Sequence, residues 1–277
     1  MRVVIAIPCY RENMDLEERA SLVQCSRVFG SKYDVVFFAP ADLECSAYLE
    51  IVPHGRVERF DNSFFTSVSS YSRLLLTPEF YLRFSDYDYM LIYQLDAWVF
   101  RDELEYWCGK GYDYIGGPFI LKYGKFERII VGNGGFSLRR ISAMLRVLSA
   151  PGKRMFPFPL LKDFFLFHIT GKRYLSALVP LLRMVGLFSN RRGKYLEQIR
   201  HEKHNSEDVV FHFLSKEFTE DGLTMPGVEE AARFSLDVEP ERFFQCMPFG
   251  AHAWMKGEYP FWKNIIPVER ECCRNDK

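Results

Sequence analysis

Two short apolar runs near the N-terminus, with a helical segment between them, restrict the fold of this chain more than any other feature. Residues 3–8 (VVIAIP) and 34–40 (DVVFFAP) are rich in β-branched and aromatic side chains and end at proline, which is typical of buried strands. Residues 14–29 lie between them and are predicted to form a helix. A strand, a helix and a second strand at this spacing predict the opening of a parallel α/β sheet.

The rest of the chain continues to alternate between strands and helices. Residues 89–93 (YMLIY) have the strongest strand pattern, and they run directly into Gln94, Leu95 and Asp96. The other predicted elements are strand 57–60, helix 69–84 with a break at Pro78, strand 112–116, helix 141–149, helix 206–216, and a late strand and loop over 243–254. The length of 277 residues and this order predict one α/β domain over residues 1–277.

The charge of the chain is balanced overall but unevenly distributed. There are 36 Lys and Arg and 36 Asp and Glu, so the formal net charge is zero. Binding to nucleic acid needs a surplus of basic side chains against the phosphates, so we expect no nucleic-acid partner. Residues 151–204 carry eleven Lys or Arg and three acidic residues, a charge of +8 that the remaining residues offset with −8.

This basic segment also contains apolar residues 174–188. Pro180 and Arg183 interrupt that stretch, which is too short and too charged to span a membrane. Apolar side chains beside Lys and Arg suit peripheral contact with the headgroups of an anionic membrane. The alternative is an inserted helical subdomain whose basic face is solvated. The sequence leaves both interpretations open.

The cysteines and the N-terminus indicate the compartment. Seven cysteines are scattered without a CxxC pair, which is typical of reduced thiols in a cytosolic protein and not of a zinc site. The apolar run before Pro8 and Arg11 is too short for a signal peptide. We therefore expect a cytoplasmic protein, placed at the inner face of the membrane if the basic segment contacts lipid.

Two segments near the middle of the chain could carry chemistry. Asp96 follows a buried strand, and ligands of open α/β sheets bind outside the carboxyl ends of strands. A carboxylate there can bind Mg²⁺ or Mn²⁺, or it can cap a turn. Three glycines at 132, 134 and 135 permit either the close approach of another molecule or a plain tight turn.

Two later segments have the same ambiguity. Glu207 and Asp208 stand at the start of a predicted helix, where carboxylates complement the helix dipole. A carboxylate at the mouth of a site can also act as a general base for an acceptor hydroxyl. His252 lies in a loop of small and aromatic residues, where it can bind a metal or a phosphate, or can be a core histidine.

Taken in order, the strings QLD, GNGGFSLRR, SEDVVF and FGAHAW resemble the motif set of nucleotide-sugar glycosyltransferases with the GT-A fold. More narrowly, the chain resembles the bacterial family DUF5672, which is grouped with glycosyltransferases. The likeness covers most of residues 1–150 and 205–262, and the basic segment about 151–204 is an insertion outside it. The resemblance implies a GT-A-like, Rossmann-type mixed, mainly parallel sheet flanked by helices.

The resemblance also implies a metal site. Asp96 matches the last acid of the DxD motif, and His252 matches the C-terminal metal-binding histidine. Gln94 stands where the first DxD acid is usual, which is a departure from the motif. The implied cofactor is Mn²⁺ or Mg²⁺, and the implied donor substrate is a nucleotide sugar whose diphosphate completes the coordination.

Roles in catalysis and sugar binding follow from the same comparison. Asp208, in a motif it shares with Glu207, matches the acid that acts as catalytic base in inverting enzymes of this fold. Gly134 and Gly135 match the segment that approaches the donor or acceptor sugar. The implied reaction transfers a sugar to a hydroxyl of a glycan or lipid-linked acceptor, as in surface polysaccharide synthesis.

The nucleotide is expected to contact the end of the first strand. Pro8 and Tyr10 would border its base, with Tyr10 stacking on it, and Arg73 is a further candidate for contact with the diphosphate. Two other functions remain open. One is a degenerate GT-A domain that binds sugar or serves as a scaffold, and the other is a sugar nucleotidyltransferase, although the latter normally has a glycine-rich basic loop after strand one.

Overall fold

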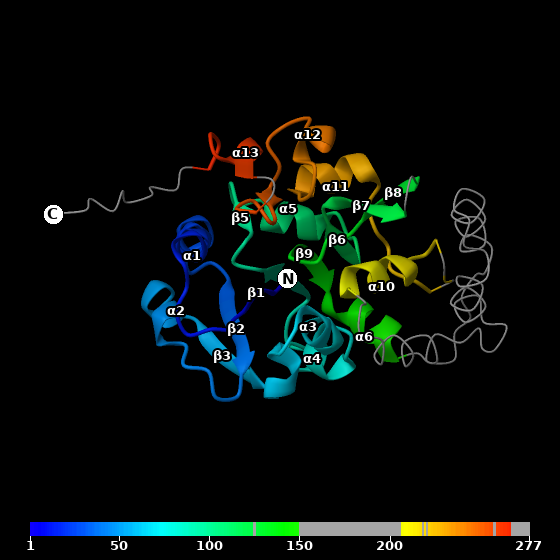
Figure 1. Ribbon diagram of the computed structural model, residues 1–277. Helices are drawn as coiled ribbons and strands as arrows, with labels where there is room; N and C mark the ends of the chain where they lie inside the picture. The colour runs from blue at the N-terminus through cyan, green and yellow to red at the C-terminus, as the bar shows by residue number, and fades with distance from the viewer. Residues whose placement is uncertain (124–125, 150–205, 218, 220, 257–258, 267–277) are drawn as a thin grey trace.

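A six-stranded sheet lies at the centre of the protein (Figure 1). The computed structural model describes residues 1–123, 126–149, 206–217, 219, 221–256 and 259–266. The strands of this sheet are β1 (Val3–Pro8), β2 (Asp34–Pro40), β3 (Arg56–Phe60), β4 (Tyr89–Tyr93), β6 (Tyr114–Gly116) and β9 (Phe136–Arg140). Their order across the sheet is β3-β2-β1-β4-β9-β6.

The pairing makes the sheet mixed but mainly parallel. β1 pairs in parallel with both β2 and β4, and β2 pairs in parallel with β3. β9 runs antiparallel to β4 and β6. The predicted strands 3–8, 34–40, 57–60 and 89–93 are confirmed, and the predicted fold class, a mainly parallel sheet flanked by helices, is confirmed with them.

Helices cover both faces of the sheet because the strands are apolar on both sides. Val3, Ile5 and Ile7 of β1 pack in one core cluster with side chains of α1 (Leu16–Phe29) and α2 (Ser46–Ile51). Val4 and Ala6 point to the other face, into a second cluster with side chains of α3 (Val68–Leu75), α4 (Pro78–Leu82), α6 (Ile141–Ser149) and α10 (Glu207–Phe213). Strands buried on both faces explain the nearly continuous apolar runs in the sequence.

Two helix boundaries follow from local chemistry. Asp15 caps α1 and forms a capping box with Glu18, so the helix begins two residues later than the predicted start at 14. The predicted break at Pro78 is confirmed, because α3 ends at Leu75 and Thr77 caps a new helix with Pro78 in its first turn.

A small three-stranded sheet joins the C-terminal part of the chain to the region after β4. Its order is β10 (Ser235–Leu236), β11 (Gly250–Ala251) and β5 (Trp98–Val99). The remaining elements are η1 (Asn62–Phe65), α5 (Leu104–Gly109), the β7 (Pro118–Tyr123) and β8 (Phe126–Val131) hairpin, α11 (Val228–Phe234), α12 (Pro240–Phe243) and α13 (Tyr259–Trp262). In Figure 1, α11, α12 and α13 gather along one side of the molecule.

Some predicted elements were wrong in kind or extent. The segment 136–140 was not predicted as a strand, yet it forms β9, which lies between β4 and β6, because its pairing partners come from other parts of the chain. The late strand predicted over 243–254 is limited to Gly250–Ala251, and helix 206–216 is limited to Glu207–Phe213. The basic segment 151–204 lies outside the described residues, and none of the described helices is long and apolar enough to cross a membrane.

Candidate functional site

A cavity of about 520 Å³ opens at the carboxyl ends of β1 and β4. The chain leaves these neighbouring parallel strands toward opposite edges of the sheet, since β2 lies beyond β1 and β9 beyond β4. Such a reversal of strand order is where open α/β sheets bind ligands. Segments from six parts of the chain form the walls of the cavity. The lining residues are Tyr10, Phe65, Thr66, Ser67, Val68, Tyr71, Ser72, Gln94, Asp96, Asn133, Gly134, Gly135, Ser206, Glu207, Asp208, His252 and Lys256.

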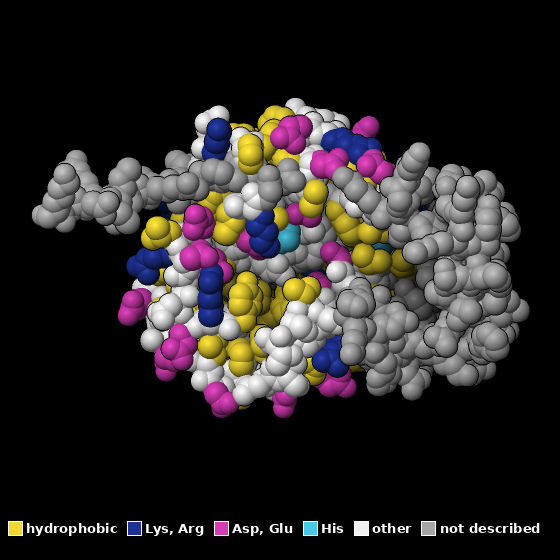
Figure 2. Space-filling view, viewed as in Figure 1, with side chains coloured by type: hydrophobic (Ala, Val, Ile, Leu, Met, Phe, Trp, Pro, Cys, Tyr) yellow, Lys and Arg dark blue, Asp and Glu magenta, His cyan; other side chains and the backbone are white. Residues whose placement is uncertain are grey.

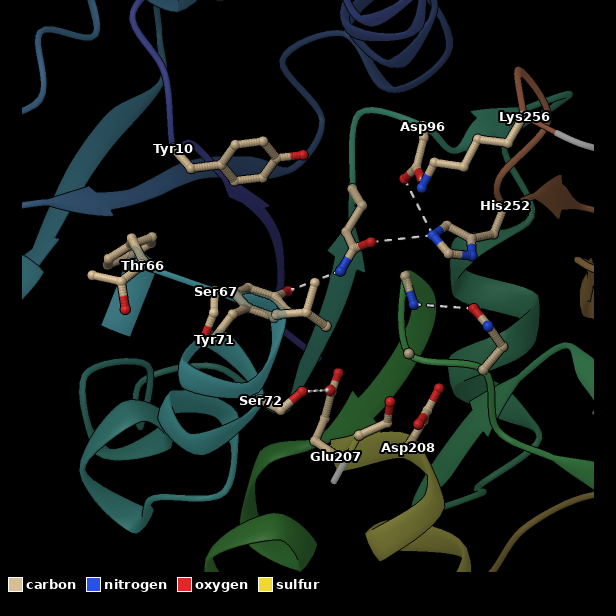
Figure 3. A pocket seen from close by; sticks show the side chains of 17 residues that line it. Tyr10, Thr66, Ser67, Tyr71, Ser72, Asp96, Glu207, Asp208, His252 and Lys256 are labelled. Carbon is tan, nitrogen blue, oxygen red and sulfur yellow. Dashed lines mark hydrogen bonds and ion pairs between the residues drawn. The ribbon is translucent and has the colours of Figure 1, made fainter. Parts of the chain in front are cut away.

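The pocket has a polar end and a more apolar wall. Figure 3 shows Asp96, His252 and Lys256 together at one end, Glu207 and Asp208 below them, and Tyr10 and Tyr71 toward the opposite wall. On the molecular surface the pocket is a hollow with a histidine side chain in its wall and hydrophobic side chains along one rim (Figure 2). This arrangement suits a ligand with a charged part and a planar or apolar part.

Asp96 and His252 face each other across the polar end. The Nε2 atom of His252 lies 3.1 Å from Asp96 Oδ1 and 3.1 Å from Gln94 Oε1. Burial would raise the pKa of the Asp96 carboxyl, but the charges of His252 and Lys256 outweigh it and hold that pKa well below its usual range. Asp96 is therefore an ionised carboxylate at the polar end of the pocket.

Asp237 supports His252 from behind. Its Oδ1 atom lies 3.2 Å from His252 Nδ1, and its Oδ2 atom accepts a 2.6 Å hydrogen bond from Asn133 Nδ2. Burial lowers the pKa of His252, but the carboxylates of Asp96 and Asp237 outweigh it and raise that pKa to about 10. The two contacts fix the imidazole so that Nε2 points into the pocket.

Lys256 brings a positive charge to the same end. Its Nζ atom lies 2.5 Å from Asp96 Oδ2, while its side chain is 65% exposed. Lys256 is the one Lys or Arg among the described residues that line the pocket. Because the ammonium group of Lys256 is exposed, it can turn from Asp96 toward an anionic ligand in the pocket.

The potential ligand atoms at the polar end of the pocket suit a divalent cation that is also coordinated by a substrate. A carboxylate oxygen suits Mn²⁺, and so does an imidazole nitrogen once the cation has displaced its proton; a carboxylate behind the histidine is the usual way to orient such a ligand. Within the described part of the chain, no group of three or more His, Cys, Asp or Glu side chains could hold a metal ion. Among the described residues at this end, Asp96 and His252 are the two side chains that could bind a cation together with other ligands.

The two acidic residues at the start of α10 are held differently. Glu207 accepts a 2.8 Å hydrogen bond from Ser72 Oγ, and its other oxygen lies 3.3 Å from Nη2 of Arg139, which is fully buried. Asp208 also lines the pocket and accepts a 2.7 Å hydrogen bond from the Val209 N–H. Burial and the neighbouring Glu207 raise the pKa of Asp208 to about 7.

The glycines before β9 are required by packing within the protein. A Cβ at Gly135 would overlap the imidazole of His252, and a Cβ at Gly134 would lie 2.5 Å from Glu207 Oε1. The Gly135 N–H donates a 3.1 Å hydrogen bond to Asn133 Oδ1. The sequence predicted that another molecule could approach these glycines closely. In the structure, at least part of that space is taken by the protein's own side chains, His252 and Glu207.

An aromatic wall faces the polar end. Tyr71 stacks on Phe38 with ring centroids 6.1 Å apart, and its hydroxyl accepts a 3.2 Å hydrogen bond from Gln94 Nε2. Tyr10 is 52% exposed, so its ring face is open to a ligand. Phe65 also lines the pocket on this side.

The structure thus brings most of the predicted site residues together. Those lining the pocket are Tyr10, Gln94, Asp96, Gly134, Gly135, Glu207, Asp208 and His252. Two are not among the lining residues. Arg73 is exposed on α3 because its neighbours Ser72 and Leu74 turn inward, and Pro8 is buried at the end of β1.

Sequence reasoning missed several residues that shape the site. They are Ser72, Asn133, Arg139, Asp237 and Lys256. Asp237 follows the short strand β10 directly, so its place at a strand end was a usable indication, but β10 itself was not predicted. Lys256 comes one helical turn's length after His252 in a segment with no regular pattern.

Comparison with known proteins identifies a family that this chain matches, whereas the similarity to solved structures is low. Residues 54–252 match the family described as "Protein of unknown function (DUF5672)". No curated protein matches the chain in sequence.

Two solved structures match part of this chain at low identity. Core-mannan synthase A (CmsA/Ktr4) from Aspergillus fumigatus, in its Mn/GDP form, is 12% identical with a TM-score of 0.36, over 44% of this chain and 43% of that one. A197 from STIV is 16% identical with a TM-score of 0.28, over 52% of this chain and 67% of that one. The likeness spans less than half the length of the mannan synthase.

Proposed function

The chain belongs to the DUF5672 family, and we propose that it is a glycosyltransferase that moves a sugar from a nucleotide-sugar donor to a hydroxyl of a glycan or lipid-linked acceptor. The observation that supports this most is the convergence of Asp96, His252 and Asp208 in one pocket at the carboxyl ends of β1 and β4. The order of their motifs along the sequence resembles that of GT-A enzymes. We propose one such domain over residues 1–277, with residues 151–204 inserted in it.

The polar end of the pocket suits the diphosphate of the donor. Asp96 and His252 would hold a divalent cation, Mn²⁺ or Mg²⁺, which would supply positive charge against the negative charge that develops on the leaving diphosphate. Asp237 keeps His252 Nε2 directed at that place, and Lys256 adds a mobile positive charge beside it. Gln94 contributes a neutral oxygen where an acid is usual in the motif.

Asp208 is our candidate for the general base. Its carboxylate would accept the proton of the acceptor hydroxyl while the hydroxyl oxygen forms its bond to the anomeric carbon. A pKa raised toward neutrality makes the carboxylate a stronger proton acceptor than an ordinary aspartate while leaving it ionised at pH 8. Attack on the face opposite the leaving diphosphate would invert the anomeric centre. Glu207 accepts a hydrogen bond from Ser72 and pairs with Arg139, so it is better suited to stabilising the site than to transferring a proton.

The experiment is a donor screen. The protein is incubated with Mn²⁺ and a panel of UDP-, GDP- and dTDP-sugars, and both nucleotide release and thermal shift are measured. We expect one nucleotide class to stabilise the protein and to be released as nucleoside diphosphate. Asp208→Asn should keep the thermal shift and lose release, whereas Asp96→Ala should lose the metal-dependent part of the shift.

The same screen separates the alternatives. Release of pyrophosphate would indicate a sugar nucleotidyltransferase, and donor binding without turnover would indicate a degenerate domain that binds sugar or serves as a scaffold. Unchanged release by Asp208→Asn would show that the base is another residue. A panel with neither shift nor release would contradict the donor assignment itself.

Our proposals for the acceptor and for the location of the protein in the cell rest on the sequence alone. We propose a cytoplasmic enzyme of surface polysaccharide synthesis, in peripheral contact with the anionic inner face of the membrane through residues 151–204. The support is the +8 charge and the apolar content of that segment, which the sequence alone provides.

A further inference from the structure

Trp254 lies between two residues of the polar end of the pocket. It follows His252 by two residues and precedes Lys256 by two, and both of those side chains line the pocket. The Trp254 side chain is fully buried and is not among the lining residues. Its ring packs edge-on against Trp98 of β5, with the ring centroids 5.5 Å apart. A residue in this place can position the polar groups of the pocket without touching a ligand.

Both N–H groups of Trp254 bind the segment that carries Asp96. The backbone N–H donates a 3.3 Å hydrogen bond to the Asp96 carbonyl, and the indole N–H donates a 3.2 Å hydrogen bond to the Ala97 carbonyl. The Ala97 N–H donates a 2.8 Å hydrogen bond to Gln94 O, which closes the turn around Asp96. This turn is therefore joined directly to the loop that carries His252.

The loop is also held on the other side of Trp254. The His252 N–H donates a 2.8 Å hydrogen bond to Leu236 O of β10. Between His252 and Trp254, Ala253 has a φ of 52°, in the left-handed region that favours glycine. A residue other than glycine keeps such a conformation where its surroundings determine it. The bend at Ala253 accompanies a change of direction, from the His252 side chain in the pocket wall to the Trp254 side chain in the core.

We propose that Trp254 is a positioning residue of the pocket, whose indole N–H keeps Asp96 in its place beside His252. The inference rests on the proposed function, in which these two side chains share a divalent cation with the diphosphate of the donor. The distance at issue is the 3.1 Å between Asp96 Oδ1 and His252 Nε2. Residues that fix the ligands of a metal from outside typically change its affinity roughly 10- to 100-fold.

Loss of the indole N–H should not by itself unfold the protein. The Ala97 carbonyl also accepts a 2.6 Å hydrogen bond from Ser21 Oγ of α1, so it keeps a partner when the indole N–H is removed. That bond joins Ala97 to α1 and does not link it to the loop of His252.

Trp262 of α13 provides a matched control. It is fully buried and belongs to the same core cluster as Trp254. Its indole N–H has no hydrogen-bond partner among the described residues. Trp262→Phe therefore makes the same change in ring size as Trp254→Phe but removes no hydrogen bond.

The first test compares these two variants in the full chain. Binding of UDP, GDP and dTDP is measured by titration calorimetry with and without Mn²⁺, and chemical denaturation is recorded in parallel. We expect Trp254→Phe to weaken the Mn²⁺-dependent binding about 10-fold, with a much smaller change in the absence of Mn²⁺. Trp262→Phe should bind as the wild type does. The proposal is overturned if the two variants have equal effects on Mn²⁺-dependent binding.

The second test measures the positioning without a nucleotide. In crystal structures of the ligand-free wild type and Trp254→Phe, we expect the Asp96–His252 separation to exceed 3.1 Å in the variant, and an unchanged separation would overturn the proposal. If no nucleotide binds to the wild type, the proposed function fails and this comparison still decides the role of Trp254. If Trp254→Phe does not fold, replacement of Trp254 by benzothienylalanine keeps the shape of the ring and puts sulfur in place of the N–H, with the same outcomes expected.

Discussion

At the scale of single residues, the neighbours Glu207 and Asp208 show how surroundings divide two equal carboxylates. Glu207 is paired with the fully buried guanidinium of Arg139, and it also accepts a hydrogen bond from Ser72. Burial disfavours the ionised form of Asp208, and the neighbouring acids Glu207 and Asp237 add to this effect, so its pKa is raised. The contacts of Glu207 suit stabilisation of the site, and the surroundings of Asp208 favour proton acceptance, the role that we propose for it.

This division predicts opposite effects of two isosteric changes. Glu207→Gln leaves the Arg139 charge buried without its partner, and we expect a loss of roughly 3 to 5 kcal/mol in the free energy of unfolding. Asp208→Asn removes a carboxylate whose folded pKa is raised, so the charged form destabilises the folded state as pH rises from about 4 toward 7. At pH 8 this variant should unfold at the same denaturant concentration as the wild type, or a higher one.

The measurement is chemical denaturation of both variants at one pH, with nucleotide release recorded beside it. We expect Asp208→Asn to lose roughly 10² to 10⁴ in turnover without losing stability. If Asp208→Asn is the less stable of the two, the roles of the two carboxylates are exchanged.

The raised pKa of Asp208 also predicts the pH dependence of turnover. Only the ionised carboxylate accepts a proton, so kcat/KM should fall as pH drops through the value of about 7, far above the acid limb of an ordinary aspartate. The acidic groups facing Asp208 are Glu207 and Asp237, and the Val209 and Gly134 N–H groups oppose them. A profile that stays flat between about pH 5 and 8 would exclude Asp208 as the base.

At the scale of elements, the turn into β9 sets the spacing of the site. The antiparallel strand β9 begins at Phe136, so residues 133–135 reach the same edge of the sheet at which β1 and β4 end. The carbonyl of Gly135 accepts a 2.9 Å hydrogen bond from the Gln94 N–H, which joins the turn to the segment leading to Asp96. The imidazole of His252 then packs on Gly135.

We therefore expect Gly135→Ala to disturb the polar end of the pocket, where we propose that a cation binds. The added methyl group would displace His252 from its place beside Asp96 and weaken Mn²⁺-dependent nucleotide binding roughly 10- to 100-fold, the range seen when the support of a metal ligand is lost. Titration calorimetry with and without Mn²⁺ measures this.

Gly109→Ala is the matched control. Gly109 ends α5 with open space around its Cα, so the change should leave binding intact and stabilise the protein by roughly 0.5 to 1 kcal/mol. Unchanged metal-dependent binding by Gly135→Ala would mean that His252 is not needed at its present place.

At the scale of the whole molecule, the uneven distribution of charge along the chain bears on where in the cell the proposed enzyme would act. The +8 of residues 151–204 stands against −8 in the rest, whose described part forms the sheet and its helices. A lipid-linked acceptor would be reached more easily if the basic segment held the enzyme at an anionic surface.

We expect the protein to float with liposomes that contain anionic lipid and not with neutral ones. Each basic side chain near such a surface contributes about 1 kcal/mol, so changing Arg191, Arg192 and Lys194 to glutamine should weaken flotation strongly while keeping the chain length. Raising the salt concentration should have the same effect. Equal flotation after deletion of residues 172–194 would assign the binding to another part of the chain.

Much of the fold could be predicted from local patterns. Runs such as 3–8 and 89–93 are apolar on both faces and show a buried strand without reference to any other segment. β9 could not be found in this way, because the pattern of residues 136–140 is ordinary and its place in the sheet comes from pairing with β4 and β6. The short strands β5, β10 and β11 exist only through pairing with one another.

For the site, the sequence by itself determined that Asp96 follows a strand and Asp208 starts a helix, because such positions follow from local structure, and it made both of them candidates. Only the tertiary structure decided which of them act on each other. Asp237 reaches His252 through the pairing of β10 with β11, and Arg139 reaches Glu207 across the core. Contacts of this kind join residues far apart in the chain, and their energies depend on burial and distance, which no single segment of the sequence contains.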